Sequence, residues 1–130
     1  MLSEKKEFST FNMPWEEVYG YVQAVKNGDT VWTSGQLGHN NEGVLLEGME
    51  NQFKQAYANI GTLLQGFGMK HDDIVEEVIY VTDMASGFEA RKICGKLFYA
   101  DPKRIASSII GVSELALPGQ MVEIKIIAKN

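Results

Sequence analysis

The sequence is poor in the residues that form disulfides and metal sites. Its 130 residues include one cysteine and two histidines. A single thiol, Cys94, excludes an intramolecular disulfide and fits a reducing, cytoplasmic compartment. His39 and His71 stand in separate polar turns, and no Cys-x-x-Cys or His-x-x-x-His spacing is present. We therefore expect neither a metal site nor a bound cofactor.

Positive charge and long apolar runs are also scarce. Lysine and arginine total 12 against 17 acidic residues, which gives a formal net charge of -5. This balance argues against a surface built to neutralise phosphates, so we expect no nucleic-acid partner. No run approaches the roughly 18 apolar residues that would span a bilayer, so we expect no membrane partner. The opening MLSEKKEFSTF has no apolar core, and we expect no secretory signal in it.

The residues that are present describe one globular domain. Hydrophobic residues make up 45% and charged residues 22% of the chain, which is the composition of a folded protein. The length allows one core but not two, and no repeat or linker divides it. The sequence predicts a single domain over residues 1–130.

The first half of the chain has a hairpin pattern. Residues 18–25, VYGYVQAV, and residues 30–38, TVWTSGQLG, flank an Asn-Gly step. Asn-Gly between two strand-like segments is a strong hairpin signal. Before this hairpin we expect a short edge strand around Phe8, followed by a loop at Pro14.

Two helices are expected in the rest of the chain. Apolar residues recur at three- and four-residue steps over residues 49–67, which predicts a helix with Gly68 as its C-terminal cap. Ser86 resembles the N-cap of a shorter helix over residues 87–98, with Glu89 in the capping-box position. The segments DDIVEEVIYVTDM, 106–113 and 120–128 have the alternation of strands.

The element order is therefore β-β-α-β-α-β-β, an α+β arrangement with a single sheet and two helices on one face. Two helices cannot cover both faces of such a sheet. The other face would expose apolar side chains, and symmetric self-association would bury them. On this ground we expect an obligate oligomer.

Several segments together resemble the Rid/YjgF family, whose members are also called reactive intermediate deaminases, endoribonuclease L-PSP or translation inhibitors. The segments are YVQAV, NGDTVWTSGQLG, QFKQAYANIGTLLQGFGMKHDDIVEEVIYVTDM and VEIKIIA, and the match spans about residues 17–129. The resemblance implies a chorismate-mutase-like α+β domain. It also implies a homotrimer with a central barrel and a small-molecule ligand in three clefts between subunits.

The resemblance also implies site residues. In the enzymatic branch an arginine binds the carboxylate of a small enamine or imine, and a glutamate on the last strand helps to position the water that hydrolyses it. Glu123, in VEIKIIA, matches that glutamate, and we expect it to be catalytic. Tyr21 matches the family's cleft aromatic residue and Ser34 matches its cleft serine. Both are expected to bind substrate.

The arginine position departs from the family pattern. ASS stands where the family has ARS, so Ser107 occupies the arginine position, and Lys92 takes the place of the family's cleft asparagine. A serine cannot make the bidentate, charge-assisted contact that a guanidinium makes with a carboxylate. The ending of the chain is most similar to YjgH-like members, which also lack the arginine. Arg104 is a candidate substitute, although an offset of three residues moves a strand side chain by about 10 Å and turns it to the other face.

These observations leave the function open between two classes of protein. The first is an imine or enamine hydrolase in which Glu123 is the acid/base, with a neutral or cationic ligand because the arginine is missing. The second is a non-catalytic trimeric module that binds a ligand or acts like a chaperone. Glu123 itself could line a cleft, or it could be a surface residue paired with a lysine such as Lys125. The acidity of the chain and the absence of paired histidines disfavour a ribonuclease.

Overall fold

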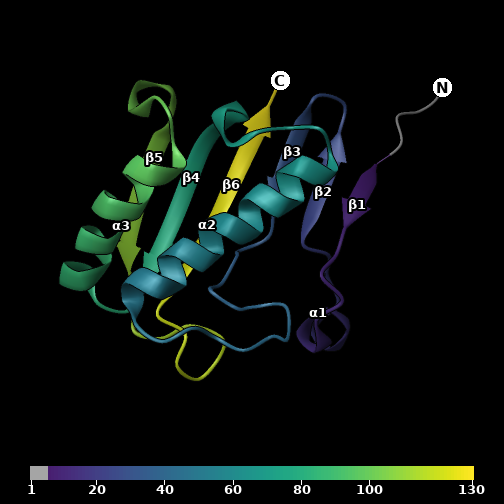
Figure 1. The fold of residues 1–130 in the computed structure, drawn as a ribbon. Coiled ribbons are helices and arrows are strands. Elements are labelled where there is room, and N and C mark those ends of the chain that lie inside the picture. Colours follow the sequence, from purple (N-terminus) through teal and green to yellow (C-terminus); the bar gives the residue numbers. More distant parts are fainter. Residues whose placement is uncertain (1–5) are drawn as a thin grey trace.

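The computed structural model describes residues 6–130; residues 1–5, which begin the segment in which we expected no secretory signal, lie outside the described residues. The fold is a six-stranded sheet in the order β1-β2-β3-β6-β4-β5, with the long helices α2 and α3 on one face (Figure 1). All strand pairs are antiparallel except β4 with β5. The strands are β1 (Glu7–Ser9), β2 (Ala24–Asn27), β3 (Thr30–Thr33), β4 (Ile74–Val81), β5 (Ala106–Gly111) and β6 (Val122–Lys129). The helices are α1 (Pro14–Tyr19), α2 (Met49–Gly66) and α3 (Met84–Phe98), with short 3-10 helices η1 (His71–Asp73) and η2 (Pro102–Arg104).

The segment before the hairpin differs from the prediction. The edge strand at Phe8 is present as β1, but the loop expected at Pro14 is the short helix α1, and the strand expected over residues 18–25 begins only at Ala24. Proline is favoured in the first turn of a helix, where no backbone donor is lost. The carboxylate of Glu16 accepts the backbone N–H of Met13 at 3.2 Å, which satisfies a donor at the helix start. The capping contact of Glu16 therefore stabilises a helix here, although the alternation of residues 18–25 predicts a strand.

The hairpin is confirmed. Strands β2 and β3 pair in register from Ala24 opposite Thr33 to Asn27 opposite Thr30. Gly28 has a φ of 66° at the first position of the two-residue turn. Asp29, at the second position, does not have a positive φ. A positive φ at the first position alone is the mark of a type II′ turn, which favours glycine there.

The first long helix is also confirmed, with small differences at its end. Helix α2 buries the apolar stripe that the periodicity picked out, and ends with Phe67 as its C-cap. Gly68 follows with a φ of 74°, and the N–H of Met69 donates to the carbonyl of Leu64 at 2.9 Å. This is the left-handed helix ending that glycine allows.

The second long helix begins earlier than predicted. Its N-cap is Asp83, whose carboxylate accepts the backbone N–H of Ser86 at 3.0 Å, so the assignment of Ser86 as the cap was wrong. Hydrogen bonds from the backbone and hydroxyl of Ser86 lower the pKa of Asp83. An anionic cap also interacts favourably with the positive end of the helix dipole, which explains why the aspartate takes this position.

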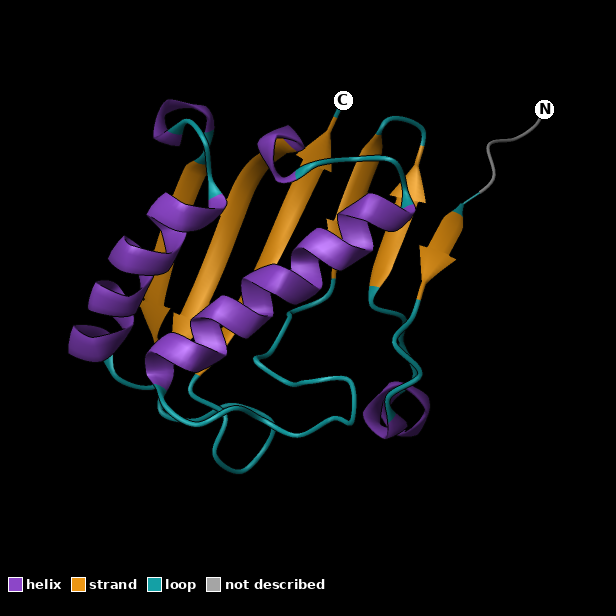
Figure 2. Ribbon diagram, viewed as in Figure 1, coloured by secondary structure: helices purple, strands orange, loops and turns teal. Residues whose placement is uncertain are grey.

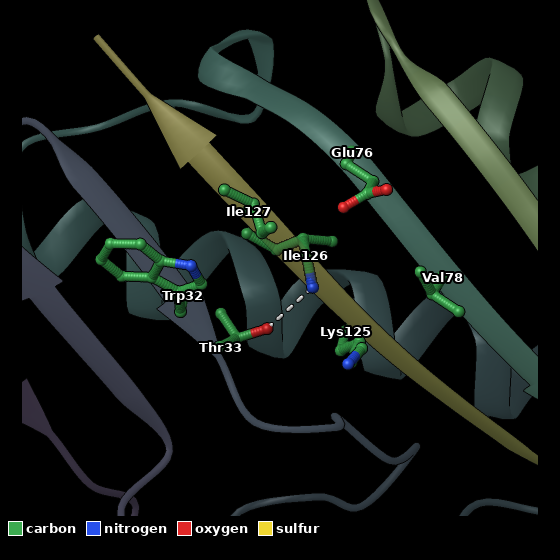
Figure 3. A pocket seen from close by; sticks show the side chains of 7 residues that line it. All are labelled: Trp32, Thr33, Glu76, Val78, Lys125, Ile126 and Ile127. Carbon is green, nitrogen blue, oxygen red and sulfur yellow. Dashed lines mark hydrogen bonds between the residues drawn. The ribbon is translucent and has the colours of Figure 1, made fainter.

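The two faces of the sheet differ as predicted, and both long helices lie on the same one (Figure 2). Along β6 alternate residues are buried beneath the helices, among them Ile124 and Ile126, while Glu123 and Lys125 belong to the opposite set. The face away from the helices exposes Trp32 to 44% of its surface. Its apolar and charged side chains stand side by side across three strands (Figure 3). Within residues 6–130 no helix covers this face. No described helix is long and apolar enough to cross a membrane.

Two glycines in the helices give a direct test of the packing. A Cβ on Gly87 would lie 2.7 Å from Cγ1 of Val81, whereas a Cβ on Gly66 would have no heavy atom within 4 Å. We expect Gly87→Ala to lower the free energy of unfolding by about 1–3 kcal/mol through overpacking. Gly66→Ala, the matched control, should raise it by about 0.5–1 kcal/mol because alanine is the better helix former. Urea denaturation measures both, and equal effects at the two positions would contradict the packing of α3 on β4.

Candidate functional site

One cavity brings together three of the residues predicted from the sequence. It has a volume of about 530 Å³. It is lined by helix α1 and the residue Tyr21 after it, by the segment that follows β3, by the loop before β6 and by β6 itself. Tyr21, Ser34 and Glu123 all contribute to its wall. The full lining is Trp15, Tyr19, Tyr21, Ser34, Gly35, Leu37, Ala116, Leu117 and Glu123.

Glu123 is half-buried on the wall of this cavity. Its carboxylate packs over the backbone of Gly35, where any Cβ would collide with it. The side chain amide of Gln120 lies 3.4 Å from Oε1. Within residues 6–130 no ion pair joins Glu123 to Lys125 or to any other cation. The geometry favours the cleft over the surface ion pair, because the acid has space in front of it and no fixed positive partner.

Tyr21 stands close enough to this acid to respond to it. Burial raises the pKa of the Tyr21 phenol, Gln23 works in the opposite direction, and the carboxylates of Glu16 and Glu123 add to the rise. The ring of Tyr21 lies edge-on to that of Tyr19, with centroids 5.7 Å apart. Tyr21 therefore presents a neutral hydroxyl, able to donate a hydrogen bond, at neutral pH.

Ser34 has a more limited role than the sequence suggested. Its hydroxyl donates to the carbonyl of Val22 at 2.7 Å. With its proton engaged in this way, the Ser34 oxygen can only accept a hydrogen bond from a ligand. The serine also fixes the strand segment that places Gly35 beneath the Glu123 carboxylate.

Helix α1 supplies two cavity residues that the sequence interpretation missed, Trp15 and Tyr19. The indole of Trp15 packs edge-on against His39, with centroids 5.2 Å apart, and its Nε1 is buried without a hydrogen-bond partner among the described residues. Two sequence signals could have revealed this helix: Pro14 at a helix start and Glu16 two residues after it.

Ser107 lies in a different environment, on the helix-covered side of β5. Its hydroxyl donates to Oε2 of Glu77 at 2.6 Å, and the same oxygen accepts a hydrogen bond from Nε of Arg91, also at 2.6 Å. The hydroxyls of Tyr57 and Tyr99 donate to Oε1, each at 2.7 Å. Glu77 is completely buried. Each of its carboxylate oxygens thus has two donors, which is how a buried carboxylate avoids a large desolvation cost.

The pKa values of the groups that donate to Glu77 are shifted by their burial and by its charge. Burial raises the pKa of Tyr57 and of Tyr99 far above the ordinary value, and the charge of Glu77 adds to the rise. Both phenols therefore stabilise the fold below about pH 10, and this contribution is lost as the pH rises further. Burial acts to lower the pKa of Arg91, but Tyr57 and Glu77 outweigh it and the net shift is upward.

The two remaining predicted residues lie apart from both groups. The ammonium of Lys92 pairs with Glu89 at 3.2 Å on the exposed side of α3. Arg104 is exposed in η2, before β5 begins. Neither residue lines the cavity that contains Glu123. The predicted set thus divides into the cavity residues, Ser107 beside Glu77, and two surface cations.

Arg91 and Glu77 were not among the residues predicted from the sequence. One signal was available for Glu77, since it lies two residues before the buried Ile79 on the same strand and so on the same face. A charged residue at such an inward position requires a partner. The partner itself comes from α3, 14 residues further along the chain, and only the packing of α3 on the sheet brings it there.

The fold and the cavity define a small α+β protein with an acid-containing pocket beside a twisted sheet. A family model described as Endoribonuclease L-PSP matches residues 6–130, and the chain belongs to this family, the Rid/YjgF family.

The similar proteins carry several names. A RutC family protein of Aquifex aeolicus is 37% identical over 109 residues, covering 83% of this chain and 86% of that protein. A 2-iminobutanoate/2-iminopropanoate deaminase of Dermatophagoides farinae is 32% identical over 88% of each chain. YjgH of Escherichia coli is 29% identical, covering 84% of this chain and 82% of YjgH. The crystal structure of RidA from Psychrobacter sp. PAMC 21119 has a TM-score of 0.84 at 31% identity, over 95% of this chain and 98% of that one. The predicted family and fold class are confirmed.

The hydrogen bonds to Glu77 can be tested with a single hydroxyl. Tyr99→Phe removes one of two donors to Oε1 and leaves a buried charge less well solvated. We expect the free energy of unfolding to fall by about 1.5–3 kcal/mol, the range for hydrogen bonds to charged groups. Tyr19→Phe is the control, because Tyr19 is 84% exposed, and it should have no measurable effect. If chemical denaturation finds the two variants equally stable, the hydrogen bond from Tyr99 to Glu77 does not contribute to the free energy of unfolding.

Proposed function

We propose that this protein binds a small imine- or enamine-type metabolite in the cavity and hydrolyses it, with Glu123 as the acid/base. The observation that carries the proposal is a half-buried carboxylate on the wall of a 530 Å³ cavity, with no cation paired to it among the described residues. A cavity of this size with a few convergent polar groups is typical of small-molecule sites. The relative from Dermatophagoides farinae, named as an iminobutanoate/iminopropanoate deaminase, supports this class of reaction.

The chemistry assigned to Glu123 is a proton transfer. The carboxylate takes a proton from a water molecule as the water oxygen bonds to the carbon of the C=N group. That proton passes to the nitrogen and gives a carbinolamine. Glu123 then takes the proton of the new hydroxyl and delivers it to the nitrogen, so that the C=O bond forms, the C–N bond breaks and ammonia leaves. A positioned carboxylate can accelerate such a step by about 10²–10⁴-fold. The Tyr21 hydroxyl, kept protonated by its raised pKa, is placed to donate a hydrogen bond to the ligand.

The proposal includes a homotrimer with the cavities at the subunit interfaces. Its support is the uncovered sheet face, on which Trp32 and Ile110 are 44% and 42% exposed. Strand β5 is also at the edge of the sheet, so one side of its backbone has no strand partner within the described chain. Exposed apolar faces and free strand edges are features that association removes. The lone buried thiol of Cys94 is compatible with a cytoplasmic location.

A non-catalytic ligand-binding module is the second candidate. One observation favours it: the cavity lining includes no lysine, arginine or histidine to fix a charged substrate. In that case Glu123 would recognise a ligand without moving a proton.

The test uses imines that an amino-acid oxidase generates in the assay. We expect Glu123→Gln to lower kcat/KM by about 100-fold or more, because glutamine keeps the shape but cannot accept a proton. Glu42→Gln, at an exposed acid in the loop before α2, is the matched control and should be fully active. Full activity of Glu123→Gln would refute the role of Glu123. If the wild-type protein hydrolyses none of these imines, the enzymatic proposal fails and the binding module is favoured.

A further inference from the structure

Glu16 is a buried acid without a cationic partner in the described chain. Only 6% of its surface is exposed, and no ion pair within residues 6–130 includes it. Its Oε2 accepts hydrogen bonds from the backbone N–H of Phe11 at 3.0 Å and from that of Met13 at 3.2 Å. The same oxygen accepts a third from Nε2 of Gln23 at 2.9 Å. A buried charge held only by neutral donors is costly, which indicates a role beyond the start of helix α1.

Glu16 holds the cavity residue Tyr21 from both sides along the chain. The backbone carbonyl of Glu16 accepts the N–H of Gly20 at 2.9 Å and that of Tyr21 at 3.0 Å, at the left-handed end of α1. Its carboxylate holds Gln23, which follows Tyr21 two positions later. The backbone before and after Tyr21 is therefore tied to one residue, and this fixes the place of the phenol ring on the cavity wall.

A chain of buried amides leads from this carboxylate to the strand that carries Glu123. Oε1 of Gln23 accepts a hydrogen bond from Nε2 of Gln36 at 2.7 Å, and both glutamine side chains are buried. The backbone of Gln36 exchanges two hydrogen bonds with that of Ile124, at 2.7 and 2.9 Å. Ile124 is the neighbour of Glu123 on β6. Gly35 precedes Gln36 and lies beneath the Glu123 carboxylate, so the chain ends at the backbone that supports this acid.

The Glu16 carboxylate sets the direction of the amide chain. A carboxylate accepts hydrogen bonds but cannot donate them, so Gln23 must turn its NH₂ group towards Glu16 and its oxygen towards Gln36. Gln36 must in turn present its NH₂ group, which also donates to the carbonyl of Ser34 at 3.1 Å. Oε1 of Gln36 is left buried without a partner among the described residues, which is the cost of this direction. A neutral amide in place of Glu16 could donate as well as accept, and the two glutamines would lose their single orientation.

We propose that Glu16 is a positioning residue for the cavity. Its carboxylate fixes the two amides, and they hold Tyr21 and Glu123 at their places on the cavity wall. Glu16 does not line this cavity, so it acts through these neighbours. Burial raises the pKa of Tyr21 most, and the charges of Glu16 and Glu123 raise it further, which keeps the hydroxyl protonated. The effect on catalysis rests on the proposed function, whereas the effect on position rests on the contacts alone.

The direction of the amide chain can be measured without turnover. Glu16→Gln keeps an acceptor for the two backbone N–H groups at the helix start but removes the charge. We expect the side-chain NH₂ resonances of Gln36 to move or to appear as two sets in ¹H–¹⁵N spectra, because its amide can then adopt either orientation. If these resonances stay as they are in the wild-type protein, the chain keeps its direction without the carboxylate and the proposal is overturned.

The imine assay measures the consequence for catalysis. Glu16→Gln should lower kcat/KM by about 10- to 100-fold, the scale of a small misplacement of reacting groups. The alkaline limb of its pH profile should move to lower pH, because loss of the Glu16 charge lowers the pKa of Tyr21. Glu17→Gln, at the exposed neighbouring acid in α1, is the matched control and should be fully active. Full activity of Glu16→Gln would overturn the proposal.

A double variant separates position from the mere presence of a folded helix. Glu16→Gln with Gln23→Glu moves the carboxylate one step along the chain, where it can accept a hydrogen bond from each neighbour. We expect it to restore the Gln36 resonances and most of the lost kcat/KM. Restored resonances without recovered activity would refute the proposal. If the wild-type protein hydrolyses no imine, the proposed function fails, and the Gln36 resonances still decide whether Glu16 fixes the chain.

Discussion

A carboxylate that is closed off from water holds one end of this fold together. Glu77 lies on β4, and its four hydrogen-bond donors come from α2, from α3, from the residue after α3 and from β5. Desolvating a charge without partners costs several kcal/mol, so these elements cannot separate from one another at small cost. The position of α3 over the sheet edge follows from this requirement. So does the position of the Arg91 guanidinium, whose Nε donates to the carboxylate and whose Nη1 lies over Gly95.

The alternation of the strands then gives the two faces of the sheet different chemistry. On one face Glu77 and its partners lie beneath the long helices. On the other face Glu123 leaves β6 towards the cavity, and apolar side chains such as Trp32 remain uncovered. Gly35 matters here because its lack of a side chain lets the Glu123 carboxylate lie against the backbone. A single sheet therefore carries an acid on one side and a guanidinium on the other.

Sequence patterns predicted the parts of the structure that depend on local order. The periodicity of residues 49–67, the hairpin at Gly28 and the inward alternation of β6 each follow from a repeat that can be counted along the chain. Tyr21, Ser34 and Glu123, chosen from the sequence, line one cavity, and their roles in it stay predictions. Helix α1 was missed because residues 18–25 alternate like a strand, whereas the helix is stabilised by the hydrogen bond that Glu16 accepts at its start. Arg91 was missed because its role depends on contact with Glu77 across 14 positions.

The most direct test of this account is a double-mutant cycle between Glu77 and Arg91, measured by urea denaturation. Arg91→Met leaves the carboxylate buried and unpaired, and should lower the free energy of unfolding by about 3–5 kcal/mol. Glu77→Gln with Arg91→Met removes both charges, and the account predicts that most of this loss is recovered. Glu77→Gln alone completes the cycle. If the loss in the double variant equals the sum of the losses in Arg91→Met and Glu77→Gln to within about 0.5 kcal/mol, the two residues are independent and the predicted coupling is contradicted.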